Sequence, residues 1–181
     1  MIPLVPHPSA PGQALRAVHA AAARTPDGML ALRYRIEGEL GWLRIPPPCA
    51  PAPGERLWRH LCCEAFLAPA ASRAAAGAEA GPGVGPYREF NFSPSGEWGA
   101  FEFHGYREGG PLSVPDPGIA VRRDGQALEL SASIEAGAAK LRLGLCVVIE
   151  ERDGGFSYWA LRHPAPRPDF HHPDGFALEI A

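Results

Sequence analysis

The sequence predicts an all-β protein, a β-sandwich or jelly roll of about ten mostly antiparallel strands. Three observations favour this fold class. Short runs of β-forming residues alternate between apolar and polar positions, as strands with one buried face do. Turn signals recur roughly every ten positions, which is the spacing of an all-β domain. The 21 glycines and 21 prolines gather in clusters between these runs, where they punctuate an ordered chain.

The predicted strands follow one another along most of the chain. Residues 13–24, "QALRAVHAAAAR", are rich in alanine, the best helix former, but their apolar positions also alternate, and we predict a strand. Residues 29–36 alternate plainly, and "GWLRI" after "EGEL" predicts a hairpin with 41–45. A further strand is expected over 57–69, "LWRHLCCEAFLAP". The remaining strands are expected to form hairpins at 87–106 around "PSGE", at 119–134 around "DGQ" and at 140–163 around "RDGG", with a last strand at 175–181.

Length and composition limit the classes of protein to consider. The 181 residues suffice for a single domain, 1–181, with an Ala/Gly-rich insertion at about residues 70–86 that we expect to be mobile. A net charge of −3 with interspersed charges gives no electrostatic basis for binding nucleic acid or an anionic membrane. The apolar runs are too short to cross a bilayer. Four cysteines without a CxxC pair, and the lack of an export signal, favour a reducing cytoplasm.

The strand predicted for "LWRHLCCEAFLAP" carries an unusual face. If it alternates throughout, Trp58, His60, Cys62, Glu64 and Phe66 all point to one side. An acid and an imidazole among large aromatic residues indicate either a polar pocket or structural residues with buried partners. The imidazole of His60 beside Glu64 favours the pocket.

A second candidate surface lies on the hairpin predicted around "PSGE". Alternation places Glu89 and Asn91 on the face opposite the phenylalanines of the first strand, while Trp98, Glu102 and His104 share a face of the second strand. A sheet face with these side chains suits a saccharide, because aromatic rings stack on its apolar face and polar groups bind its hydroxyls. The alternative is a solvent-exposed polar face on which Trp98 covers an edge.

Catalysis has less support in the sequence. Glu64, Glu89 and Glu102 could provide the two carboxylates of a glycoside hydrolase, but the sequence does not define their separation. It contains no GxSxG elbow, no P-loop, and no dinucleotide-binding glycine motif ahead of a helix. We therefore expect a binding module and not an enzyme.

The segment "LRHPAPRPDFHHPDGF" groups His163, Asp169, His171, His172 and Asp174. Imidazole and carboxylate side chains bind zinc, iron or copper, and carboxylates with carbonyls bind calcium. The spacing matches no standard zinc motif, however, and the prolines indicate a fixed loop in which Asp and His bond backbone amides. A metal site and a structural or ligand-contacting loop both remain open.

Three long strings, "LWRHLCCEAFLAP", "YREFNFSPSGEWGAFEFHGYREG" and "FSYWALRHPAPRPDFHHPDGFALEI", resemble the bacterial DOMON-like family, which is related in fold to the family-9 carbohydrate-binding modules. The resemblance implies an immunoglobulin-like or jelly-roll β-sandwich that binds a sugar, or heme in some members, with calcium as a structural ion in some relatives. Trp58, Trp98 and Trp159 are then the candidates for clamping a sugar. Heme ligation by Met and His is disfavoured in a chain whose only methionines are Met1 and Met29, whereas ligation by histidine alone stays open.

These observations together predict a cytoplasmic, non-catalytic module that binds a small polar ligand such as a saccharide. No cofactor is required, although heme or calcium would agree with the resemblance. The alternatives are a heme- or metal-binding domain that uses the His-rich loop, and a protein-interaction module. The candidate ligand-binding residues are Trp58, His60, Glu64, Glu89, Asn91, Trp98 and Trp159, and the candidate metal ligands are His163, Asp169, His171 and His172.

Overall fold

The computed structural model describes residues 1–70 and 85–181, so nearly all of the predicted Ala/Gly-rich insertion lies outside the described residues. Apart from three short 3-10 turns, η1 (Leu40–Trp42), η2 (Leu57–Arg59) and η3 (Pro173–Gly175), the regular structure within these ranges consists of strands. The strands are β1 (Ile2–Pro6), β2 (Leu15–Arg24), β3 (Met29–Gly38), β4 (Cys62–Pro69), β5 (Tyr87–Phe92), β6 (Trp98–Gly105), β7 (Glu108–Pro111), β8 (Ala120–Arg123), β9 (Ala127–Glu135), β10 (Leu141–Glu150), β11 (Phe156–Ala160) and β12 (Leu178–Ile180).

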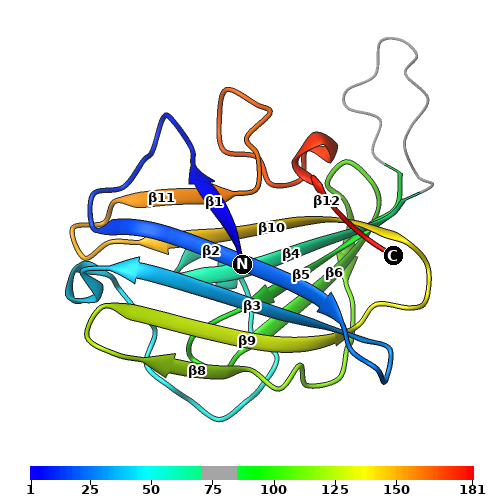
Figure 1. Ribbon diagram of the computed structural model, residues 1–181, viewed down its shortest axis with the longest axis horizontal. Coiled ribbons are helices and arrows are strands. Elements are labelled where there is room, and N and C mark those ends of the chain that lie inside the picture. The colour runs from blue at the N-terminus through cyan, green and yellow to red at the C-terminus, as the bar shows by residue number, and fades with distance from the viewer. Residues whose placement is uncertain (71–84) are drawn as a thin grey trace.

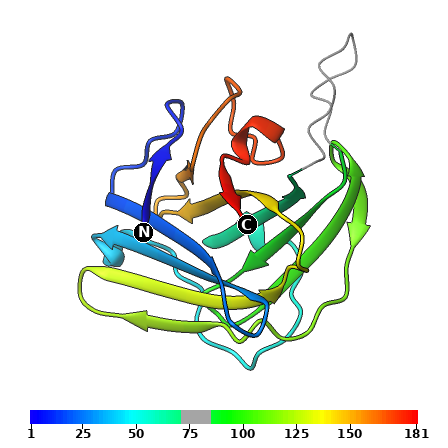
Figure 2. The ribbon, with the colours of Figure 1, turned by 45° about the vertical axis from the view of Figure 1, so that its right-hand side comes forward.

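All of these strands pair antiparallel and form two facing layers. One path of hydrogen-bonded strands, β7-β6-β5-β4-β10-β11-β1-β2-β3-β9-β8, folds over on itself, and β12 adds to β10. β1 connects the layers because it pairs with β11 on one side and with β2 on the other. Figure 1 shows β2, β3, β9 and β8 in front of β4, β5, β6 and β10, and in Figure 2 the green strands curve behind the blue and cyan ones. The all-β prediction is therefore confirmed, and the described residues form twelve strands where about ten were expected.

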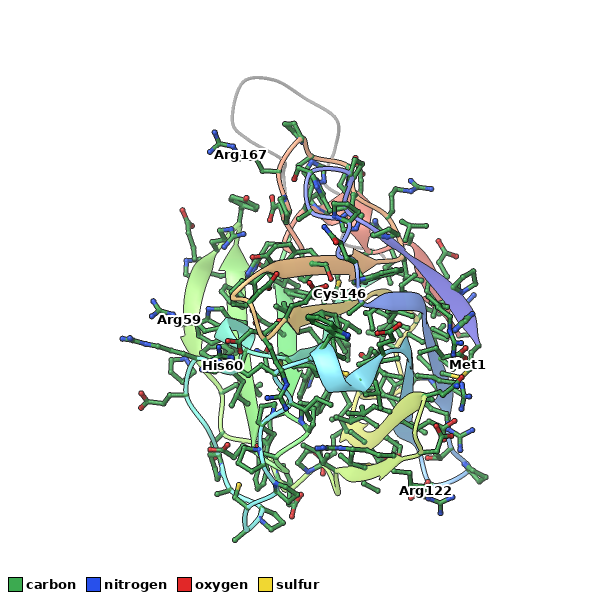
Figure 3. All side chains as sticks on the ribbon, turned by 90° about the vertical axis from the view of Figure 1, so that its left-hand side faces the viewer. Met1, Arg59, His60, Arg122, Cys146 and Arg167 are labelled. Carbon is green, nitrogen blue, oxygen red and sulfur yellow. The ribbon has the colours of Figure 1, made fainter. Side chains whose placement is uncertain are left out.

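Alternating side chains of the two layers fill the space between them. Every second residue of β3, β9 and β10 belongs to one buried apolar cluster, which is the core that the period-two pattern predicts. The hydroxyl of Tyr34 in β3 crosses this core and donates a hydrogen bond of 2.8 Å to the backbone carbonyl of Glu64 in β4. Figure 3 shows side chains filling the interior, while Arg59 and Arg122 project outward. One face of the β4–β5–β6–β10 layer is thus used for the core, and its other face is left for a site.

The structure confirms most of the predicted elements. The alanine-rich segment forms β2, and the β5–β6, β8–β9 and β10–β11 hairpins occur where the turn signals were found. The strand expected at 41–45 is wrong, since Leu40–Trp42 form η1 and Leu43 makes only an isolated bridge with Glu151. Both edges of β3 are already paired, with β2 and β9, so no edge remains for a further hairpin strand.

The strand expected over 57–69 is shorter than predicted. It begins at Cys62, because Arg56 adopts a left-handed backbone conformation with φ of 53° and Leu57–Arg59 then form η2. The buried side chain of Leu57 anchors this turn against the sandwich. In the described part of the chain, no helix has the length and hydropathy needed to cross a membrane.

Candidate functional site

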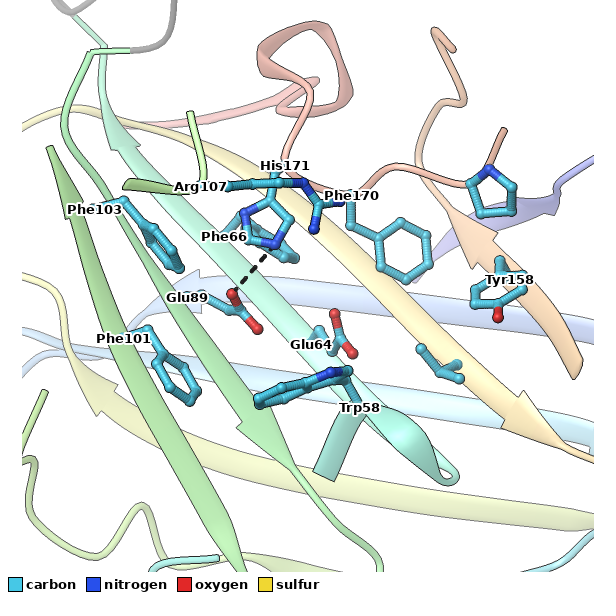
Figure 4. A pocket seen from close by; sticks show the side chains of 12 residues that line it. Trp58, Glu64, Phe66, Glu89, Phe101, Phe103, Arg107, Tyr158, Phe170 and His171 are labelled. Atoms are coloured by element: carbon cyan, nitrogen blue, oxygen red, sulfur yellow. Dashed lines mark ion pairs between the residues drawn. The ribbon is translucent and has the colours of Figure 1, made fainter. Parts of the chain in front are cut away.

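A cavity of about 390 Å³ opens on the outer face of the β4–β5–β6–β10 layer. Its floor is formed by the strands, and its rim by η2, by the β6–β7 turn and by the segment between β11 and η3 (Figure 4). The loops therefore cover a sheet face that a sandwich normally exposes to solvent. The lining residues are Trp58, Glu64, Phe66, Glu89, Phe101, Phe103, Arg107, Val148, Tyr158, Pro168, Phe170 and His171.

Strand alternation explains why two carboxyl groups lie on the floor. Cys63, Ala65 and Leu67 point into the core between the layers, so Glu64 and Phe66 point to the outer face. β4 and β5 pair with Glu64 opposite Asn91 and Phe66 opposite Glu89. Directly opposite residues of an antiparallel pair share a face. Glu64 and Glu89 are therefore diagonal neighbours on adjacent strands, and both face the cavity.

Aromatic rings form the walls of the cavity. Phe101 and Phe103 line it from β6, with ring centroids 6.5 Å apart. Trp58 meets Phe101 edge to face at 5.5 Å. Tyr158 contributes from β11, and its ring lies 6.1 Å from that of Phe170 on the overlying segment. The indole of Trp58, whose residue is 40% exposed, is thus held beside the opening rather than in the core.

The segment over the cavity is held down by a buried phenylalanine. Phe176, next to η3, stacks on Phe66 with centroids 5.8 Å apart. Gly144 in β10 allows this approach, because a Cβ there would lie 2.9 Å from the Phe176 ring. The imidazole Nδ1 of His172 accepts a hydrogen bond from the backbone of Asp174 and caps η3. These contacts position Phe170 and His171 over the strands.

The two floor carboxyl groups differ in their partners. Glu64 is 3% exposed, and its Oε1 has no hydrogen-bond partner among the described residues. Burial raises the pKa of Glu64 well above its ordinary value, and the neighbouring charge of Glu89 raises it further, against an opposing effect of Arg107. Burial also raises the pKa of Glu89, although Asn91 Nδ2 donates a 2.7 Å hydrogen bond to its Oε1 and opposes the shift. The pair therefore keeps protons to higher pH than ordinary carboxyl groups do.

Arg107 is the guanidinium that lines the cavity, and it is already paired. Its Nη2 lies 3.0 Å from Asp169 Oδ1, and the hydroxyl of Tyr106 donates a 2.7 Å hydrogen bond to the other oxygen of Asp169. Arg107 itself has a left-handed backbone with φ of 58° in the β6–β7 turn. The contact with Asp169 therefore ties this turn to the segment that carries His171.

His171 is a neutral imidazole near physiological pH. Its pKa is lowered to about 4, first by burial and then by the charge of Arg107. Tyr87 Oη accepts a hydrogen bond from the Arg107 backbone amide and is hydrogen-bonded to His171 Nδ1 at 2.8 Å. On the other side of the ring, His171 Nε2 lies 3.6 Å from Glu89 Oε2. Both imidazole nitrogens face protein groups.

Three predicted ligand-binding residues meet at the cavity. Trp58, Glu64 and Glu89 line it, and Asn91 is buried on the same face, where it supports Glu89. His60 does not take part, because the strand begins after it. Its exposed imidazole lies 2.9 Å from the Glu150 carboxylate instead.

Trp98 and Trp159 lie in the core between the layers, which corrects the predicted faces. β6 pairs with β5 so that Phe92 is opposite Trp98 and Glu89 is opposite Phe101. Trp98, 8% exposed, therefore shares the core face of Phe92, while Phe101 lies on the cavity face, where Trp98 is predicted from the sequence. Trp98 also lines a neighbouring hollow of about 630 Å³. Trp58 and Phe101 line both this hollow and the cavity.

The four predicted metal ligands have four different surroundings. His163 Nε2 lies 2.9 Å from the Val5 carbonyl oxygen, Asp169 binds Arg107, His171 faces the cavity and His172 caps η3. Within residues 1–70 and 85–181, no group of three His, Cys, Asp or Glu side chains could hold a metal ion. The loop histidines and Asp169 have structural or cavity-lining positions.

Sequence reasoning missed several lining residues. Alternation places Phe66 on the face of Glu64, yet Phe66 is not among the predicted ligand-binding residues. Phe101 and Phe103 lie on the face of β6 opposite the one predicted to carry the site. Arg107 carries no sequence signal, since a left-handed turn brings it to the site. Tyr158 and Phe170 are far from β4 in sequence and reach the cavity only through the sheet order.

Comparison with protein-family models, with curated proteins and with solved structures finds no match to this chain. The resemblance to the DOMON-like family therefore stays a prediction, and the site has to be interpreted from its own geometry.

Proposed function

We propose that this protein is a non-catalytic binding module whose cavity takes a small polar ligand with an apolar ring face, such as a saccharide. The observation that carries this proposal is Glu64, a buried residue that lines the cavity and whose Oε1 has no partner among the described residues. An unsatisfied buried polar group costs about 1–3 kcal/mol. A ligand that hydrogen-bonds to this oxygen recovers that free energy on binding.

The walls of the cavity support the same ligand class. Aromatic rings such as Trp58 and Phe101 offer surfaces for the C–H face of a sugar ring, while Glu64 and Glu89 can bond its hydroxyls. The volume of about 390 Å³ is in the range of small-molecule sites, roughly 300–1,000 Å³. His171 Nδ1 is hydrogen-bonded to Tyr87 and its Nε2 faces Glu89 at 3.6 Å, which gives heme or metal binding less support than a polar organic ligand.

The proposal includes a location in the cytoplasm. The four cysteines, Cys49, Cys62, Cys63 and Cys146, are all free thiols. Unpaired cysteines are typical of proteins in reducing compartments.

Thermal shift and calorimetric titration with a panel of mono- and disaccharides test the proposal. A ligand at 100 times its Kd stabilises the native state by about 2.7 kcal/mol, which for a protein of this size raises Tm by about 5–11 °C. Trp58→Ala and Glu64→Gln should reduce that shift. Trp42→Ala is the matched control, because Trp42 is an exposed tryptophan that does not line the cavity. The proposal would be overturned if no saccharide of the panel shifts Tm or gives a heat of binding. It would also be overturned if Trp42→Ala and Trp58→Ala reduce the Tm shift equally.

A further inference from the structure

The two carboxyl groups on the cavity floor have no charged basic partner among the described residues. Glu64 and Glu89 both lie on the floor, and among the described residues no basic side chain forms an ion pair with Glu64. Arg107 lines the cavity but is bound to Asp169 at 3.0 Å. His171 is 3.6 Å from Glu89, yet its pKa of about 4 leaves it uncharged near neutral pH. Within the described residues, the floor carboxyl groups therefore form no ion pair with a charged basic side chain, although Arg107 is near enough to lower the pKa of both.

Aromatic rings surround these carboxyl groups. Figure 4 shows the carboxyl groups of Glu64 and Glu89 near the centre of the cavity, with Trp58 and Phe101 on one side and Phe170 on another. Aromatic faces attract cations through their quadrupole, and tryptophan does so best. Carboxylates enclosed by aromatic rings are suited to a positively charged group with an apolar frame. A bound cation would favour release of the protons that burial holds on these carboxyl groups, whereas a neutral polar ligand would leave them protonated.

We propose that the ligand carries a protonated amine, which binds between Glu64 and Glu89 while its carbon frame lies against the aromatic walls. This inference rests on the proposed function and specifies its ligand class. An ammonium group has three N–H donors, enough to reach Glu64 Oε1 and the carboxylate of Glu89 together, whereas a hydroxyl has one. Its hydrogen bonds to carboxylates are charge-assisted and are about twice as strong as neutral ones. The amine is attached either to a sugar ring or to a plain apolar ring, and the test separates these two sources.

Matched ligand pairs test the inference on the wild-type protein. Glucosamine is compared by calorimetric titration with glucose and with N-acetylglucosamine, which keep the ring but lack the charge. Benzylamine is compared with benzyl alcohol. We expect each amine to bind about tenfold or more tightly than its neutral counterpart. Preference for glucosamine over benzylamine would identify an amino sugar as the source, and the reverse would identify an apolar amine.

Variants then assign the preference to the floor carboxyl groups. Glu64→Gln or Glu89→Gln should abolish the discrimination between amine and neutral ligand. The control Glu129→Gln removes a carboxylate of β9 that does not line the cavity, and it should leave the discrimination between amine and neutral ligand unchanged. Either floor variant suffices if the other does not fold.

The two proposals fail in different ways. Equal binding of glucose and glucosamine would overturn the amine inference and would leave the saccharide-binding proposal standing. Discrimination that survives in both floor variants would also overturn it, since the charge of these carboxylates would then be irrelevant. Absence of binding by all five compounds and by the saccharide panel would overturn both proposals.

Discussion

Replacing Glu64 by glutamine tests whether burial holds this carboxyl group in its protonated form. The side chain is 3% exposed, and its pKa is raised well above the ordinary 4.5. Between pH 4.5 and that raised pKa, the native protein keeps a proton that the unfolded chain releases. The free energy of unfolding of the wild type therefore falls as pH rises through this window, and it is independent of this group below the window. Glutamine does not titrate, so the variant lacks this dependence.

The slope of that dependence can be stated in advance. One proton retained only by the native state lowers the free energy of unfolding by about 1.4 kcal/mol per pH unit. Between pH 5.5 and 7.5, the free energy of unfolding of Glu64→Gln relative to that of the wild type should rise by up to about 2.7 kcal/mol. This is the limit for one proton that the native wild type retains over the whole range. Sharing of the proton between Glu64 and Glu89 makes the measured gain smaller than this limit.

Urea denaturation at pH 4.5, 5.5, 6.5 and 7.5, followed by tryptophan fluorescence, measures both proteins. The difference between the two curves cancels the titration of the groups they share. A difference that stays constant over this range, or that shrinks as pH rises, would show that Glu64 is ionised in the native protein. The description of the cavity floor would then be wrong.

Three further substitutions test the packing that positions the site, each by equilibrium urea denaturation. Tyr34→Phe removes the hydrogen bond between the layers and should lower the free energy of unfolding by about 1–2 kcal/mol; an unchanged value would mean that this bond contributes nothing. Gly144→Ala places a Cβ 2.9 Å from the Phe176 ring and should cost about 1–3 kcal/mol more than Gly110→Ala, whose Cβ has no neighbour within 4 Å. Trp98→Ala should lower the free energy of unfolding by about 3–5 kcal/mol, since the ring is in the core. A decrease below about 1 kcal/mol would show that the ring lies on the surface, as the sequence predicts.

The strands of this protein could be predicted from the sequence because the relevant interactions are local. Alternation in β3, β9 and β10 and the turn residues of the hairpins are properties of neighbouring residues. The same pattern identified Glu64 and Glu89 as residues that face away from the core. It failed at 41–45, where the outcome depended on whether β3 had a free edge.

The sequence by itself determined the all-β class and most strand positions, and it indicated a polar face for Glu64 and one for Glu89, which the pairing of β4 with β5 then joins. Only the tertiary structure decided which face of β6 is buried, because alternation defines two faces for each strand and pairing with β5 selects between them. The pairing buries Trp98 and turns Phe101 toward Glu89. Tertiary structure also brings Arg107 and His171 over the floor, since their approach depends on a left-handed turn and on a loop anchored by Phe176. Contacts between residues distant in the chain leave no periodic signal in the sequence, and in this protein such contacts complete the site.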